Sequence, residues 1–372
     1  MASITKATTG KGETRYKVRV VTGYAPSGDP MQEQRTFKLK REAETWGKQR
    51  ETEIERGLGG DGGKVRLAEF LAQWLERGAK RVRPSTMIDY RYQVEKRILP
   101  ALGAAYLRDL KPHTLQAWID ALPTPYVAQR ARRILHIALG EAEQLGLIPA
   151  NPLHRTKAPA APAREGQSWT PEQARTFLAL ARRQCYEPIW TLALRTGMRP
   201  SELRALLWTD IDLAGCTIRV QRARPNVYGQ DIAAAKPKSK AGTRTIGISA
   251  PLAAYLRGQH AAQLERRMLQ GPRWEEHGLV CPSTTGTPLG HANVYHRFRE
   301  MCAKAGVPLI RLYDLRHSAA SMMLEAGADL KATSEVLGHS DPRITQKVYQ
   351  HTSRNQRDGA LALLAEALED PT

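Results

Sequence analysis

Five side chains in the second half of the 372-residue sequence have the types that could break a phosphodiester bond. Arginines can hold phosphate oxygens, a lysine can protonate a leaving oxygen, and a tyrosine can act as a nucleophile. The motifs that carry them are, in order, TGMRPSEL with Arg199, KPKSKAGTRTI with Lys240, YDLRHSAASMMLEAG with Arg316, and LGHSDPRITQKVYQH with His339 and Tyr349. The sequence has no GxxxxGKS/T or HExxH motif and no tight acidic cluster, so these cations would do the work of a catalytic metal ion.

Arg199 is predicted to lie in a tight junction between two helices. Gly197 can end the first helix and Pro200 can begin the second. Glu202, three residues after the arginine, can support a neighbouring side chain or cap the second helix. An ordinary helix–turn–helix with an arginine on its surface would have the same pattern.

A long polar hairpin, 222–243, joins two β-like runs, GCTIRVQ and TRTIGIS. The end of this hairpin contains Lys236, Lys238 and Lys240, and a mobile lysine there could give a proton to a leaving oxygen. A solvated basic loop is the alternative interpretation.

Asp314 is predicted to cap a helix whose first turn displays Arg316 and His317. The helix dipole and the guanidinium would both favour an anion at this end. A structural ion pair is the alternative.

His339 follows Gly338, which is predicted to end a helix, and Tyr349 lies about two turns along the next helix. Taken alone, the histidine could simply bond to the backbone of its turn, and the tyrosine could be an ordinary residue of an amphipathic core.

The chain is strongly basic. It has 56 Lys and Arg against 37 Asp and Glu, a net charge of +19, which is typical of a protein that binds nucleic acid. Four scattered cysteines without a CxxC motif indicate reduced thiols in the cytoplasm. No apolar stretch approaches the roughly 18 residues of a membrane span. We therefore expect a cytoplasmic protein that binds nucleic acid, with no membrane partner.

Residues 1–60 are predicted to form a small sheet and a helix that ends at Gly57. Alternation over TRYKVRVVTGY puts an apolar set on one face, Tyr16, Val18 and Val20, and a basic set on the other, Arg15, Lys17 and Arg19. The basic face could read DNA, although an ordinary solvated sheet face would look similar.

Residues 64–157 are predicted to form an all-helical bundle with one basic side. RLAEFLAQWLERG repeats apolar residues at helical spacing, and Ser85 or Thr86 is expected to cap a following helix. The predicted DNA-binding residues of this bundle are Lys80, Arg81, Arg83, Arg130, Arg132 and Arg133. A linker rich in Pro and Ala, 151–166, separates it from the remainder.

Residues 165–372 are predicted to be mixed α and β, mainly helical, with a small antiparallel sheet and a C-terminal tail. Thr170, Pro171 and Gln173 form a capping-box pattern at the first helix of this part. The chain is thus expected to be multidomain.

The five residues of these four motifs occur in the order and approximate spacing of one family. Over roughly 165–360, the chain resembles the tyrosine site-specific recombinases, the phage-integrase family. Residues 64–164 resemble the helical core-binding domain of that family, and residues 1–60 resemble its three-stranded arm-type DNA-binding domain.

The resemblance implies that Tyr349 attacks a DNA phosphate to form a 3′-phosphotyrosyl bond. Arg199 and Arg316 would clamp the phosphate, Lys240 would protonate the leaving 5′ oxygen, and His339 would bond the phosphate or assist proton transfer. Glu202 would orient its neighbours. Neither a metal, ATP nor another cofactor is implied.

One position departs from the family pattern. Tyr313 stands where the family commonly has a histidine; it could bond the phosphate or be a bystander, and His317 and Asp314 could support the site. Lys238 is the alternative to Lys240, because the alignment of the hairpin is loose.

The implied partners are double-stranded DNA at core and arm-type sites, a homotetramer on that DNA, and possible host bending and directionality factors. The resemblance also implies a nucleoid-associated protein of a bacterial cell or a phage-infected host. The tail carries Leu361, Leu364 and Leu368 on one helical face, and it could pack in cis or dock onto a neighbouring protomer. The alternatives are a type IB-like topoisomerase or nicking enzyme, and a catalytically inactive architectural DNA-binding protein.

Overall fold

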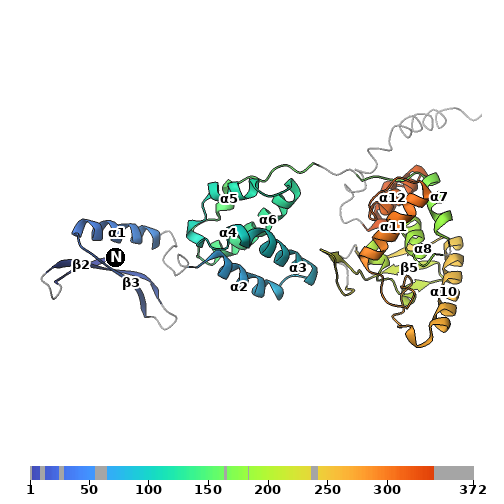
Figure 1. Ribbon diagram of the computed structural model, residues 1–372, viewed down its shortest axis with the longest axis horizontal. Helices are drawn as coiled ribbons and strands as arrows, with labels where there is room; N and C mark the ends of the chain where they lie inside the picture. Colours follow the sequence, from blue (N-terminus) through green and yellow to red (C-terminus); the bar gives the residue numbers. More distant parts are fainter. Residues whose placement is uncertain are drawn as a thin grey trace, which may run out of the picture. The chain divides into compact units, whose positions relative to one another are not determined.

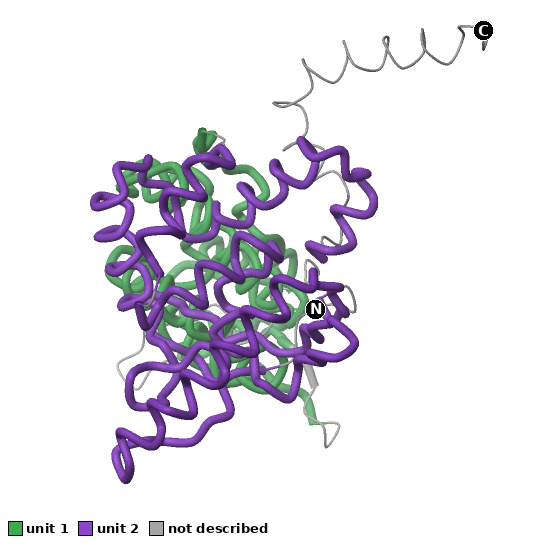
Figure 2. Tube along the Cα trace, turned by 90° about the vertical axis from the view of Figure 1, so that its right-hand side faces the viewer, with its two compact units in different colours: residues 1–163 green, residues 164–372 purple. Residues whose placement is uncertain are grey.

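The computed structural model describes seven stretches of the chain: 2–8, 13–24, 29–54, 65–162, 166–182, 184–235 and 242–338. The chain divides into two compact units, Met1–Ala163 and Arg164–Thr372, as Figure 2 shows. The division falls inside the linker expected over 151–166. Within the described stretches, no helix is both long and apolar enough to span a membrane.

A three-stranded antiparallel sheet begins the first unit. The strands follow the order β1-β2-β3, and helix α1 lies along the sheet (Figure 1). Their bounds are Ser3–Thr8 for β1, Thr14–Tyr24 for β2, Pro30–Phe37 for β3 and Lys40–Glu53 for α1. The alternation of β2 buries Val18 and Val20 against Ala43 of α1, as its pattern predicted. The predicted helix end at Gly57 lies outside the described residues.

Over the described residues 65–162, the named elements of the first unit are helical. They are α2 (Leu67–Ala79), α3 (Pro84–Gln93), a π-helical turn (Val94–Ile98), α4 (Leu99–Leu102), α5 (Pro112–Asp120) and α6 (Pro125–Gln144), with short 3-10 turns at Leu107–Asp109 and Pro152–Arg155. Every apolar residue at helical spacing in α2 is buried: Leu67, Phe70, Leu71, Trp74 and Leu75.

The expected cap of α3 was wrong. The helix begins at Pro84, so Arg83 occupies the cap position and makes no side-chain cap bond. Proline is well suited to the first helical position, because its fixed φ matches the helix and its missing N–H would have had no partner there. Ser85 and Thr86 therefore fall inside the first turn.

The second unit is mainly helical with a small antiparallel sheet, which confirms the predicted fold class. Strands β4 (Ile211–Asp212), β5 (Thr217–Val220) and β8 (Arg244–Gly247) pair in the order β4-β5-β8, and β6 (Asn226–Val227) pairs with β7 (Gln230–Asp231). The helices are α7 (Pro171–Ala181), α8 (Glu187–Thr196), α9 (Pro200–Leu203), α10 (Ala250–Gln270), α11 (His291–Ala305), α12 (Asp314–Glu325) and α13 (Leu330–Leu337).

An aromatic cluster forms the centre of this second unit. Trp169, Phe177, Trp190 and Phe298 pack with neighbouring ring centroids 4.9 to 6.5 Å apart. At the start of α7, the Thr170 hydroxyl accepts from Gln173 N and the Gln173 side chain accepts from Thr170 N, which is the capping box that the sequence predicted. This core fixes α8 and α11, and α12 packs against α8.

Candidate active site

The candidate site lies where α8, α9, α12, α13 and β8 pack together. Gly197 allows this close approach. It ends α8 with φ +64°, a conformation that favours glycine, and a Cβ at this position would lie 2.3 Å from Leu337 Cδ2. Its carbonyl accepts a hydrogen bond from Arg316 Nη1 at 2.9 Å. The turn after α8 therefore joins α12 to the C-terminal end of α13.

Glu202 is a buried carboxylate that holds two arginines. It accepts from the backbone N and Nη1 of Arg199, at 2.9 and 2.7 Å, and from Nη1 and Nη2 of Arg244, at 3.1 and 3.0 Å. Burial by itself would raise the pKa of Glu202, but the hydrogen bonds and charges of Arg244 and Arg199 outweigh it and hold this pKa below its usual value. Glu202 thus both caps α9 and supports Arg199.

Arg316 has hydrogen-bonding capacity that its described surroundings do not use. Its side chain is 2% exposed, and among the described residues neither Nε nor Nη2 has a hydrogen-bond partner. Burial and, next, the charge of Arg199 lower the pKa of Arg316 to about 10, so the group is still a cation at neutral pH. A buried cation with spare donors is suited to bind an anion.

Two arginines hold the end of α13. Arg199 Nη2 donates to the Gly338 carbonyl at 3.0 Å, and Arg244 Nε donates to the Val336 carbonyl at 2.7 Å. The last carbonyls of a helix lack partners within it, and cations are favoured at that end. The backbone that immediately precedes His339 is therefore tied to the site.

Tyr313 and Asp314 stand at the start of α12. The Tyr313 ring is 41% exposed, and its carbonyl accepts from Arg316 N at 3.1 Å. Asp314 is buried and accepts from Nε and Nη2 of Arg311, both at 2.8 Å. The predicted capping role of Asp314 was wrong: α12 begins at Asp314, and the cap position belongs to Tyr313, which makes no side-chain cap bond.

His317 packs between the start of α12 and the linker. Its ring lies 5.6 Å from the Tyr313 ring in an edge-on arrangement, and a Cβ on Gly166 would come within 3.0 Å of it. Burial lowers the pKa of His317 and the positive charges of Arg311 and Arg316 lower it further, although Asp314 opposes them. The ring is therefore mainly neutral at neutral pH and acts as a hydrogen-bonding group there.

Three of the six predicted catalytic residues lie in the described part of the chain: Arg199, Tyr313 and Arg316. The structure brings Arg199 and Arg316 together around the Gly197 turn, and Tyr313 lies near enough to Arg316 to influence its pKa. Lys240, His339 and Tyr349 lie outside the described residues, as do Lys236, Lys238 and the C-terminal tail. The sequence reasoning missed Arg244, because it treated TRTI only as a strand; a charged residue inside an otherwise β-like run was the one available signal.

The basic residues predicted to bind DNA differ in their surroundings. In the sheet, Arg15 Nη2 pairs with Glu13 at 2.8 Å and Arg19 Nε donates to Gln34 at 3.2 Å, while Lys17 is half-buried. In the bundle, Lys80, Arg81, Arg83 and Arg133 are exposed.

Arg130 and Arg132 serve the packing of the bundle. Arg130 Nε pairs with the buried Asp89 at 2.8 Å. Arg132 donates to the Thr156 hydroxyl and to the carbonyls of Leu153 and Thr156 at 2.8 to 3.0 Å. These bonds give both arginines a structural role, and DNA contacts by them stay a prediction.

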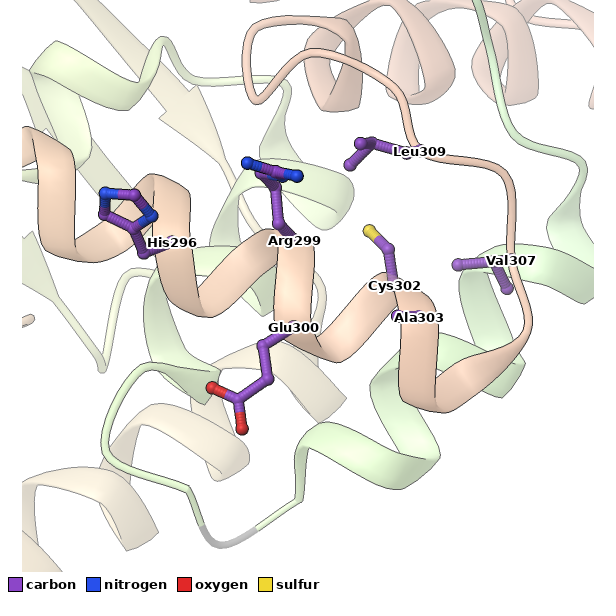
Figure 3. A pocket seen from close by; sticks show the side chains of 7 residues that line it. All are labelled: His296, Arg299, Glu300, Cys302, Ala303, Val307 and Leu309. Atoms are coloured by element: carbon purple, nitrogen blue, oxygen red, sulfur yellow. The ribbon is translucent and has the colours of Figure 1, made fainter.

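A cavity of about 420 Å³ lies beside α11. Figure 3 shows side chains of α11, among them His296, Arg299 and Cys302, on one side of it and Val307 and Leu309 of the following loop on the other. Arg199, Tyr313 and Arg316, the predicted catalytic residues within the described part of the chain, do not line this cavity.

Two family models match the chain. Residues 168–356 match the phage integrase family, and residues 66–122 match the phage integrase N-terminal SAM-like domain. The chain is 28% identical to an integrase of Streptomyces ambofaciens, over 89% of this chain and 88% of that protein. It is 26% identical to a XerC-like tyrosine recombinase of Caldanaerobacter subterraneus subsp. tengcongensis, over 95% of this chain and 96% of that protein.

Solved structures share the fold at low sequence identity. The Tn1549 transposon integrase in complex with transposon right end DNA has a TM-score of 0.66 at 19% identity and covers 81% of this chain and 100% of that one. A lambda integrase tetramer bound to a Holliday junction has a TM-score of 0.58 at 20% identity and covers 92% of this chain and 94% of that one.

Proposed function

From the premise that this chain belongs to the phage integrase family and is a tyrosine recombinase, we propose that it integrates and excises a mobile element by site-specific strand exchange. The proposed intermediate is a 3′-phosphotyrosyl bond between DNA and Tyr349. One observation carries the proposal: Arg316 is a buried cation with two unpartnered donors among the described residues, and it stands beside Arg199.

The spare donors of Arg316 fit the oxygens of a phosphodiester. Each buried donor without a partner costs about 1–3 kcal/mol, and a phosphate that accepted from both would remove this cost. Arg199, whose side chain is 28% exposed, can reach the same phosphate from the accessible side. The two guanidinium groups would hold the non-bridging oxygens and stabilise the charge that develops there as Tyr349 attacks.

Strand cleavage by Tyr349 has a known energetic requirement. A free tyrosine has a pKa of about 10, so roughly one in a thousand is ionised at pH 7, which corresponds to about 4 kcal/mol. In the proposed step, the Tyr349 oxygen bonds to phosphorus while the bond to the 5′ oxygen breaks. His339 assists removal of the phenolic proton, and Lys240 gives a proton to the departing 5′ oxygen.

The phosphotyrosyl bond keeps the energy of the broken diester, so the 5′-hydroxyl of a second strand can reverse the step without ATP. Tyr313, exposed next to Arg316, supplies a hydroxyl that could bond the phosphate in place of the histidine common in this family. Orientation of the arginines is the role that we propose for Glu202.

The proposed partner is double-stranded DNA. We propose an arm-binding domain at 1–60, a core-binding domain at 64–157 and a catalytic domain at 165–372, acting as a tetramer on two sites. Support comes from the basic charge of the chain and from the lambda integrase, which has been solved as a tetramer on a Holliday junction.

Trapping a covalent adduct tests the proposal. The protein first selects its core site from a randomised pool of duplexes. A nicked version of that duplex then lets the short 5′-hydroxyl fragment leave after cleavage, so that the adduct accumulates. We expect an adduct from the parent protein and none from Tyr349→Phe at equal DNA binding. No adduct from the parent, or an equal adduct from Tyr349→Phe, would refute the proposed mechanism.

A further inference from the structure

Arg244 connects three elements of the candidate site. It is the first residue of β8, and its side chain is 8% exposed. Nη1 and Nη2 bind both carboxylate oxygens of Glu202, which lies in α9, and Nε binds the carbonyl of Val336 in the last turn of α13. A planar guanidinium with a bidentate partner and a third bond has little freedom to turn.

Both acceptors of the Arg199 guanidinium belong to the elements that Arg244 joins. Arg199 Nη1 donates to Glu202 Oε1, and Arg199 Nη2 donates to the Gly338 carbonyl, two residues after Val336. Without Arg244, α9 and the end of α13 would lose this shared bond. The two anchors of Arg199 could then shift relative to each other.

Arg244 also shares the charge of Glu202. The Glu202 carboxylate faces the guanidinium groups of Arg199 and Arg244, so these three side chains together keep an excess positive charge beside Arg316. If Arg244 were absent, the Glu202 charge would be directed at Arg199 alone and would reduce the attraction of Arg199 for an anion.

We propose that Arg244 is a positioning residue for strand cleavage, which holds Glu202 and the end of α13 so that Arg199 presents its guanidinium to the scissile phosphate. This inference rests on the proposed function. The Arg244 side chain is 8% exposed, against 28% for Arg199, and three of its five N–H groups already donate to protein acceptors, so we place its action on Arg199. A simple contribution to folding is the competing explanation, and the two differ in how they depend on the charge of the phosphate.

The test compares two nicked duplexes with Arg244→Met and Arg244→Lys. One duplex carries an ordinary scissile phosphate, and the other carries a methylphosphonate, which has lost one charged oxygen and so needs less from Arg199. On the phosphate, we expect Arg244→Met to slow adduct formation about 100-fold, the size typical for loss of a pre-positioned donor. On the methylphosphonate, we expect a loss of about 10-fold or less.

Two further measurements separate positioning from folding. DNA affinity of Arg244→Met should stay within about threefold of the parent, because the contacts along the duplex remain. Leu256→Ala is the matched control: Leu256 is fully buried in the core of the same unit, has no bond to Glu202, and should slow both substrates by the same factor. Arg244→Lys keeps the charge and one bond to Glu202, so it should fall between parent and Arg244→Met. If Arg244→Met does not fold, the test uses Arg244→Lys instead. Its loss of rate on the phosphate duplex is compared with its loss of rate on the methylphosphonate duplex.

The possible outcomes distinguish failure of the positioning role of Arg244 from failure of the proposed strand-cleavage function. A parent protein that forms no adduct on either duplex would overturn both. The positioning role alone would be overturned if the parent cleaves and the Arg244 variants slow adduct formation by the same factor on both duplexes. It would also be overturned if the variants slow adduct formation on the phosphate by less than about twofold.

Discussion

Replacing Gly197 by alanine tests the packing on which the site depends. The residue has φ +64°, and the new Cβ would lie 2.3 Å from Leu337 Cδ2. Leu337 is completely buried, so its side chain has little room to move. The same turn presents the carbonyl that Arg316 Nη1 binds.

The expected cost has two parts. The left-handed backbone conformation costs an alanine about 1–2 kcal/mol, and the overpacked contact costs about 1–3 kcal/mol. Leu337→Ala alone should cost about 2–5 kcal/mol, because it empties a buried site. In the double variant the alanine Cβ meets a vacant space, so the contact cost disappears. We therefore expect the double variant to lose about 1–3 kcal/mol less than the sum of the two single variants.

Hydrogen exchange of the α8 and α12 amides measures this in the whole chain, because it reports the free energy of opening of these helices without unfolding the other unit. Adduct formation on the nicked duplex is measured in parallel and should fall with Gly197→Ala, since the acceptor of Arg316 shifts. Single effects that add within about 0.5 kcal/mol would show that Gly197 and Leu337 do not compete for space, and would refute the packing argument.

Three further outcomes are expected. Glu202→Gln should destabilise the second unit by about 3–5 kcal/mol in the same exchange measurement, because it removes a buried charge that faces two guanidinium groups; a loss below about 1 kcal/mol would contradict this. The pKa of His317 is lowered on folding, chiefly by burial, so the folded state resists its protonation. The free energy of unfolding should therefore fall as the pH is lowered from about 7.5 to about 5.5, and it should fall less in His317→Gln. Equal pH profiles for the parent and His317→Gln would argue against this. Arg133 is exposed, so Arg133→Ala should weaken DNA binding and reduce the slope of log affinity against log salt concentration by about one. Arg132 bonds within the bundle, so Arg132→Ala should mainly lower the melting temperature. The reverse pattern would show that Arg132 binds DNA and that Arg133 stabilises the bundle.

The elements that were predictable from the sequence are those with a local cause. Helical spacing placed the buried face of α2, and alternation placed Val18 and Val20 inside the sheet. Glycine at the end of α8 and proline at the start of α9 marked the junction that carries Arg199. Each of these signals depends on residues within one or two turns of each other, so the printed sequence contains it in full.

The two wrong expectations came from competing groups that are close by in the sequence. Ser85 and Thr86 are suitable caps, but Pro84 satisfied the first helical position and moved the start of α3. Asp314 is also a suitable cap, but Arg311 occupies both of its oxygens. A carboxylate bonds more strongly to a guanidinium than to a backbone amide, and the sequence does not say which one is nearer.

The sequence by itself predicted the chemical types of the site: two arginines, a lysine, a histidine and a tyrosine in a definite order, on a strongly basic chain. The tertiary structure decided which groups touch. Arg199 meets Gly338 across 139 residues, Arg316 meets Gly197 across 119, and Arg244 meets Glu202 across 42. The chain has many other arginines. The packing of α8, α9, α12 and α13 around the Gly197 turn decides that Arg199, Arg316 and Arg244 make these contacts. The spare donors of Arg316 are likewise a product of burial, which no spacing of residues encodes.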